Sequence, residues 1–227
     1  MRRILLCLAL LLPPITAHAD TESYNRVDFQ VEAGREIGND LLLARMQIDI
    51  QDKLPANLSQ RVNATVNEAL KQAKAFPTVK VSSGNQQSFP IHGKQNQIDA
   101  WRGHAEIRIE SRDFKSAGML IAQLQPALQI AHLEFAVSPD ARQRAENELI
   151  GEAIKAFRQR AEMIRNSMGA QGYKPVALSI STSGGPQPLV RGMMHATAMA
   201  DTAMPPAEFE GGDTRLTVQI TGTIELE

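Results

Sequence analysis

Apolar and polar side chains alternate along much of the chain. The clearest example is the last stretch, TRLTVQITGTIEL at 214–226, where the two kinds of residue follow each other strictly. Successive side chains of a β-strand point to opposite faces, so this period of two is typical of a strand with one buried face. Alternating or short apolar runs predict strands over residues 26–33, 41–52, 78–83, 98–111, 128–137, 175–181 and 214–226.

Glycine and polar residues indicate how neighbouring strands connect. Gly34 and Gly38 separate the first two runs, which are therefore expected to form a β-hairpin. Residues 84–97 are mostly polar and are expected to connect two further strands, with room for a short strand around Phe89.

Other stretches repeat their apolar residues with the period of an α-helix. Between Pro55 and Pro77 an apolar side chain recurs every four residues, which predicts a helix with one stripe facing the core. Pro55 stands where the first turn of a helix tolerates proline. Asp113 is suited to cap a second helix that extends to Leu124, because its side chain can accept a hydrogen bond from a free backbone N–H. The stripe of the first helix consists of Leu58, Val62, Val66 and Leu70.

The longest predicted helix begins at Pro139 and ends at Met168. Ser138 is a favourable N-cap residue, and Gly169 suits the left-handed position that follows a helix. About 30 residues at 1.5 Å each give a length of roughly 45 Å. The alanines of its apolar stripe allow a close approach to a sheet. The stripe consists of Ala141, Ala145, Leu149, Ala153, Phe157, Ala161, Ile164 and Met168.

Together these elements predict a single α+β domain, in which a mainly antiparallel sheet is packed by two or three helices. Residues 184–212 follow neither period and are rich in methionine, proline and glycine. They are therefore predicted to form a long loop.

Residues 1–19 have the features of a secretory signal peptide. Arg2 and Arg3 precede the apolar run 4–12, and an Ala-His-Ala cleavage sequence ends at Ala19. Cleavage after Ala19 would leave residues 20–227 as the exported domain, and this leader favours the bacterial periplasm. The apolar run is shorter than the roughly 20 residues of a membrane span, and no other stretch approaches that length.

Cysteine and charge content restrict the possible functions. Cys7, the only cysteine, lies in the leader, so the exported chain is expected to rely on its core rather than on disulfides. Removing Arg2 and Arg3 from 24 basic side chains leaves 22 against 25 acidic ones, a formal charge of −3. No basic run is dense enough to suggest nucleic acid or anionic lipid.

From Ile98 onward, several short sequences in their order resemble the SIMPL-domain family, whose bacterial members are exported proteins of poorly defined function. They are IDAWRGHAEIRIESRDF, LEFAVSPD, EAIKAFRQRAEMIRNSMG and FEGGDTRLTVQITGTIEL. The resemblance covers nearly all of the exported chain. Trp101 stands where tyrosine is usual, and Asn39-Asp40 stands where Pro-Asp is expected. The resemblance implies a role in an envelope stress response, and it carries no catalytic residues.

Signatures of common enzymes are missing from the sequence, which contains no HExxH, GxSxG, P-loop or dinucleotide-binding glycine pattern. Ser179, Ser181 and Ser183 have no identifiable base to activate them. The nearby carboxylates Glu146 and Glu148 are expected on different faces of one helix, because residues two apart do not meet. The histidines outside the leader are far apart in sequence, at His92, His104, His132 and His195.

The predicted loop concentrates methionine around His195. Met193, Met194 and Met199 offer thioether sulfur, which suits Cu(I) or Ag(I), and the imidazole can complete such a site. The same residues are compatible with an assembly contact or with reversible oxidation to sulfoxide. The loop lacks the repeated MxM or MxxM spacing of dedicated copper carriers, so a loose loop or an assembly contact is favoured.

The leading hypothesis is a non-enzymatic periplasmic protein that forms a homo-oligomer or binds a protein partner. No cofactor, nucleic-acid partner or membrane span is expected. The surfaces favoured for assembly are the long helix, an exposed edge of the strand 214–226 and the loop 184–212. The alternatives are a Cu(I)-binding protein that uses the methionine loop and a hydrolase whose site forms only in three dimensions.

Overall fold

The computed structural model describes residues 24–184 and 210–227. The leader prediction and most of the predicted loop therefore lie outside the described residues. None of the described helices combines the length and the apolar character needed to cross a membrane. In chain order the elements are β1 (Arg26–Gly38), β2 (Leu41–Asp52), α1 (Pro55–Ala73), β3 (Val79–His92), the short 3₁₀ turn η1 (Lys94–Asn96), β4 (Ile98–Ser111), α2 (Phe114–Leu124), β5 (Gln129–Ala136), α3 (Pro139–Met168), β6 (Tyr173–Ser183) and β7 (Asp213–Leu226).

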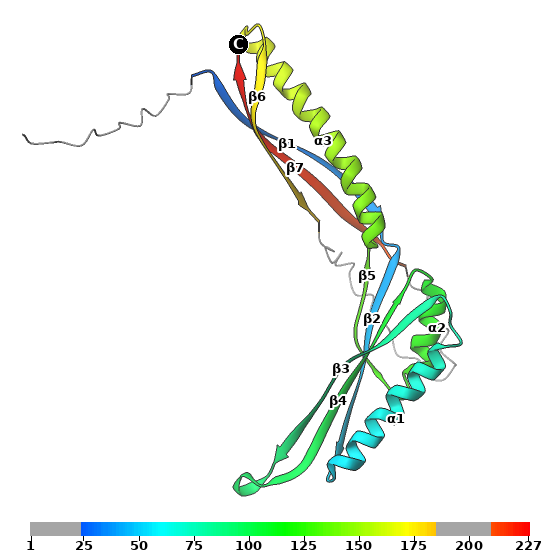
Figure 1. Cartoon of the computed structure of the whole chain (residues 1–227). Helices are drawn as coiled ribbons and strands as arrows, with labels where there is room; N and C mark the ends of the chain where they lie inside the picture. Colours follow the sequence, from blue (N-terminus) through cyan, green and yellow to red (C-terminus); the bar gives the residue numbers. More distant parts are fainter. Residues whose placement is uncertain (1–23, 185–209) are drawn as a thin grey trace, which may run out of the picture.

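The described strands form two antiparallel sheets that lie end to end (Figure 1). One sheet has the order β1-β7-β6 and is covered by α3, and the other has the order β3-β4-β2-β5 and is covered by α1 and α2. The predicted α+β class and the antiparallel pairing are confirmed. The strands are divided between two sheets, each with its own buried face.

The predicted hairpin between the first two strands is wrong. β1 pairs with β7, whereas β2 pairs with β4 and β5 in the other sheet. The apolar face of β1 packs against α3, and that of β2 packs against α1 and α2. Because the two faces serve different cores, the chain continues from one sheet into the next instead of turning back.

The predicted exposed edge of the last strand is also wrong. β7 lies in the centre of its sheet, with β1 on one side and β6 on the other. Its even-numbered residues from Leu216 to Leu226 face α3, and five of these side chains are buried. The strict alternation indicates a strand with one covered face. It does not indicate whether the two edges of the strand are paired.

α3 packs over β1 and β7 through the small residues predicted from its stripe. Ala153 and Ala161 are completely buried, and Phe157 between them is 3% exposed. The ring of Phe157 stacks on Phe29 of β1, with 4.5 Å between ring centroids. It lies directly over Gly222 of β7, where an added Cβ would come within 2.7 Å of the ring. The aromatic ring therefore depends on a glycine beneath it.

The other helix predictions are confirmed, except that the Ser138 side chain does not act as the predicted cap of α3. α1 buries Leu58, Val62 and Val66 as expected, and Asp113 caps α2 by accepting from the N–H of Ser116 at 3.0 Å. α3 ends at Gly169 in the left-handed conformation, with φ of 69°. Ser138 occupies the N-cap position of α3, but its hydroxyl makes no capping bond to the helix.

β3 is longer than predicted, because it continues through the polar stretch to His92. It is an edge strand, and most of its side chains from Ser82 onward are exposed. A strand without a buried face has no reason to alternate, so its sequence carries no period-two signal. Pairing with β4, interrupted by a register shift between Ser83 and Gln86, shows that this stretch is a strand.

The connection between the sheets is fixed by the side chain of Asn39. Its Nδ2 donates to the carbonyl of Gly211 at 2.8 Å, and its Oδ1 accepts from Thr214 Oγ1 at 2.7 Å. The backbone N–H of Asn39 donates to the carbonyl of Gly212 at 2.9 Å. The passage from β1 to β2 is thereby tied to the start of β7.

Asp40 ties the same passage to the start of α3. Its carboxylate accepts from the N–H and from the hydroxyl of Ser138 at 2.6 and 2.7 Å. Partial burial raises the pKa of Asp40, but the two bonds from Ser138, together with the Arg112 guanidinium 3.8 Å away, outweigh it. The pKa of Asp40 is therefore held below its usual value.

Replacing Asp40 by asparagine is expected to lower the free energy of unfolding by about 1 kcal/mol near pH 7, because the side chain is 39% exposed and solvent weakens its charge-assisted bonds. A depressed folded-state pKa stabilises the protein above the usual carboxyl pKa of about 3.9, and this contribution is lost as the pH falls through the folded value. The difference in the free energy of unfolding from the unmutated protein should therefore shrink in acid.

Urea unfolding over a pH series measures this difference in the free energy of unfolding, and Glu32→Gln on β1 is the control. A difference that stays constant with pH would exclude the charge as its cause.

Candidate interaction surface

β6 presents an uncharged and exposed strand edge. Every residue of the strand after Tyr173 is exposed, and residues 177–183 (ALSISTS) contain no charge and no proline. On one side β6 pairs with β7, and no described strand lies on its other side. The outer edge therefore offers unpaired backbone groups over an uncharged stretch without proline, which is the kind of edge that pairs with another chain.

An apolar strip runs along this edge. Leu178 and Ile180 lie opposite Gly222 and Ile220 of β7, which places them on the face that α3 covers. α3 lies over β1 and β7, and in Figure 1 the second half of β6 runs along the side of the sheet away from it. Leu178 remains 47% exposed and Ile180 remains 42% exposed. The buried core of this sheet thus continues into a strip that the described residues leave open.

The other sheet edges carry features that discourage pairing. β1 has five charged side chains, and the guanidinium of Arg35 bridges Glu148 and Glu152 of α3 at 2.6 and 2.5 Å. β3 contains Pro90 and an irregular register, and β5 is short and carries a histidine and a glutamate. Charges, prolines and bulges are the usual protection of edge strands. Among the described edges, β6 after Pro175 has the fewest of these protective features.

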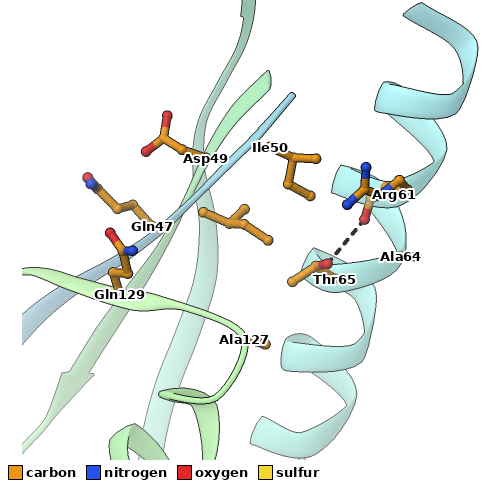
Figure 2. A pocket seen from close by; sticks show the side chains of 9 residues that line it. Gln47, Asp49, Ile50, Arg61, Ala64, Thr65, Ala127 and Gln129 are labelled. Atoms are coloured by element: carbon orange, nitrogen blue, oxygen red, sulfur yellow. Dashed lines mark hydrogen bonds between the residues drawn. The ribbon is translucent and has the colours of Figure 1, made fainter. Parts of the chain in front are cut away.

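A second open stretch lies on β2, beyond the end of β5. Gln129, at the start of β5, pairs with Gln47, and β2 continues past this point to Asp52. A hollow of about 530 Å³ lies there between β2 and α1. Figure 2 shows Ile50 on the side of this hollow near α1, and Gln47 and Gln129 on the other side.

Arg61 of α1 occupies part of this hollow. Its guanidinium approaches the carbonyl of Gln51 at 3.4 Å and the carboxylate of Asp52 at 3.5 Å. The hydroxyl of Thr65 donates to the backbone carbonyl of Arg61, as the dashed line in Figure 2 shows. These groups are engaged within the protein. Asp49 and Thr65 also line the hollow, but they bond to His104 and to the Arg61 carbonyl rather than to each other. β6 is therefore the stronger candidate surface.

The predicted soft-metal residues Met193, Met194, His195 and Met199 lie outside the described residues, so the three interpretations of the loop stay predictions. Within the described part of the chain, no group of three or more His, Cys, Asp or Glu side chains is arranged to hold a metal ion.

The described histidines and the candidate serines lie in different sheets. His92, His104 and His132 belong to β3, β4 and β5, whereas Ser179, Ser181 and Ser183 belong to β6. His104 lies 3.3 Å from Asp49, and His132 lies 3.2 Å from Glu134. No described histidine is thus placed in the same sheet as these serines.

The two acidic residues of α3 singled out in the sequence bind different partners. Glu146 accepts from Arg142 one turn earlier on the same helix, at 2.8 Å, and Glu148 accepts from Arg35 of β1. The Arg35–Glu148 pair is exposed, and the Arg142–Glu146 pair is partly buried. They are ion pairs of a helix face, in agreement with the expectation that residues two apart do not meet.

Comparison with known proteins identifies the family. A model of the SIMPL family, described as a protein of unknown function (DUF541), matches residues 27–224. No curated protein matches the chain. The matched region extends from β1 to β7 and so includes both sheets and all three described helices. The chain therefore belongs to the SIMPL (DUF541) family.

Proposed function

We propose that this protein is a non-enzymatic assembly module that pairs with a second copy of itself through β6. The observation that carries the proposal is the open edge of β6, whose residues 177–183 are exposed and uncharged. Two-stranded pairing between identical edges is self-complementary, which is the arrangement that a twofold dimer requires.

Antiparallel pairing about Ser179 is the register that fits this strand best. It would place Leu178 against Ile180 of the second copy, so that the exposed strips of both chains cover each other. It would also leave Lys174 and the proline at position 175 near the ends of the contact. The result would be a six-stranded sheet with the α3 helices on one face.

The proposed setting is the bacterial periplasm, and the proposed role is in envelope or oxidative stress defence. The leader at residues 1–19 supports export, and the family resemblance supports the stress role. Selective release of the outer compartment of cells that produce the protein tests the location. Recovery of the cleaved chain only from the cytoplasm would contradict it.

The molar mass of the purified protein, measured by light scattering after size exclusion, tests the proposal. Twice the monomer mass is expected, both for the unmutated chain and for a variant that lacks residues 187–206, because the contact belongs to β6. A monomer over the whole concentration range would contradict self-association. A dimer that disappears with residues 187–206 would assign the contact to the methionine loop instead.

A further inference from the structure

The face of the four-stranded sheet opposite α1 and α2 carries a row of basic side chains. Arg45 of β2 lies directly opposite Arg108 of β4 on one side and opposite His132 of β5 on the other. Ser82 of β3 lies opposite Arg108 and extends the row to the fourth strand. Directly opposed residues of antiparallel strands project from the same face, so these four side chains form one line across the sheet.

The two arginines of this row have no partner in the described part of the chain. Neither guanidinium makes a hydrogen bond or an ion pair with a described residue, although both side chains are exposed on a face that also carries carboxylates. Like charges directly opposite each other destabilise a sheet. The Arg45–Arg108 pair thus has a cost that the described residues do not offset.

The neighbouring carboxylates are engaged elsewhere. Glu110 lies 3.3 Å from Lys80, Glu134 lies 3.2 Å from His132, and Glu106 lies 3.5 Å from His104. Glu110 is paired with the ammonium of Lys80, while Glu134 and Glu106 each lie beside an imidazole, and none of the three forms an ion pair with Arg45 or Arg108. Arg45 and Arg108 thus remain without an acidic partner among the described residues.

A hollow of about 400 Å³ lies over this pair. Its floor is the sheet itself at Leu43 and Ala44, and Lys80 and His132 stand on opposite sides of it. The carboxylates of Glu110 and Glu134 also line the hollow, the first beside Lys80 and the second beside His132. A hollow of this size accommodates a small anion or the headgroup of a larger molecule. The hydroxyl of Ser82 adds a neutral hydrogen-bonding group at its border.

We propose that this hollow, the Arg45–Arg108 site, binds a phosphoryl group. A guanidinium donates two parallel N–H bonds to the oxygens of a phosphate, and two opposed guanidiniums supply the charge that balances a dianion. Binding would offset the repulsion between the arginines. The recognised chemistry is the phosphoryl dianion, supplied by free phosphate, by a small phosphomonoester or by the phosphomonoester headgroup of a lipid such as phosphatidic acid. The site does not depend on the pairing of β6, which lies in the other sheet.

Isothermal titration of the purified protein with inorganic phosphate and with glycerol phosphate, at constant ionic strength, tests the site. The double variant Arg45→Gln/Arg108→Gln should bind at least about tenfold more weakly. The matched control Arg158→Gln/Arg160→Gln removes the same charge from two exposed positions of α3 and should change the affinity by less than about twofold. Equal loss of phosphate affinity in both double variants would show that the effect comes from net charge alone, and it would contradict the proposed site.

Three further measurements test the folding of the variant, the role of the paired N–H donors and the source of the phosphoryl group. In phosphate-free buffer the glutamine double variant should melt at the same temperature as the unmutated protein or higher, because no ion pair is lost. Arg45→Lys/Arg108→Lys keeps the charge but loses the paired donors, so weakened phosphate binding is expected. Flotation with vesicles of phosphatidylcholine, with or without phosphatidic acid, separates the sources. Binding to the phosphatidic acid vesicles alone that needs both arginines assigns a lipid headgroup, and no binding to phosphate, phosphomonoester or vesicles overturns the proposal.

Discussion

Lysine in place of Ile180 is expected to convert the dimer into a monomer. Pairing about Ser179 buries residue 180 against Leu178 of the second copy, and a twofold contact places two lysines in it. Lysine on an edge strand is a common protection against pairing, because its charge would have to leave water. A weakening of dimerisation by at least about a hundredfold is expected, read as the molar mass by light scattering over a dilution series.

The same substitution on the opposite edge of the sheet provides the control. Gln30 is an exposed residue of β1, so Gln30→Lys adds the same charge to the same sheet and should leave the dimer mass unchanged. Because Ile180 is already 42% exposed, Ile180→Lys should keep the circular dichroism spectrum of the folded protein. Dimer masses for both variants would place the contact away from β6.

Replacing Phe157 by alanine is expected to cause the largest loss of stability. The ring is 3% exposed, stacks on Phe29 and fills the space above Gly222. Its removal leaves a cavity between α3 and the sheet, and changes of this kind cost about 3–5 kcal/mol. α3 contacts the rest of the described chain mainly through this sheet, so little else can compensate.

Urea unfolding measures this loss, and the Ile180→Lys background keeps the free energy of unfolding independent of protein concentration. Met163→Ala on the same helix is the control, because Met163 is 60% exposed and its truncation should cost less than about 0.5 kcal/mol. A loss below about 1 kcal/mol for Phe157→Ala would show that the ring is not the central contact between α3 and its sheet.

Local signals predicted the helices well. The Ser138-Pro139 start and the Gly169 end of α3 are set by neighbouring residues, and both boundaries agree with the structure. The buried stripe holds from Ala145 to Ala161, whereas Met168 at the helix end is exposed. Period and capping depend on the nearest few residues, so one sequence contains the information they need.

Strand pairing was not accessible in the same way. The alternation of β1 and β2 showed that each has a buried face, but not that the faces belong to different cores. Asn39 and Asp40 decide this, because they bind Thr214 and Ser138, which are far away in the sequence. The central position of β7 was missed for the same reason, since each partner of a strand is set by the whole topology.

The candidate surfaces were only partly visible in the sequence. The uncharged run 177–183 is visible in the sequence. It identifies an open edge only when the strand order, which places β6 outermost in its sheet, is also known. The Arg45–Arg108 pair could not be predicted, because 63 residues of sequence separate two side chains that the register places opposite each other. The methionine loop, the strongest compositional signal, lies outside the described residues.

A cysteine at position 179 tests the pairing of β6 most directly. In a Cys7→Ser background, Ser179→Cys should form a disulfide-linked dimer under mild oxidation. Directly opposed residues of antiparallel strands have Cα atoms about 4.5–5.5 Å apart, within the range that a disulfide spans. Ser183→Cys, four residues further along the same strand, would lie roughly 27 Å from its counterpart and should stay monomeric on a denaturing gel. No linked dimer for Ser179→Cys, or equal linkage at both positions, would contradict assembly through this edge.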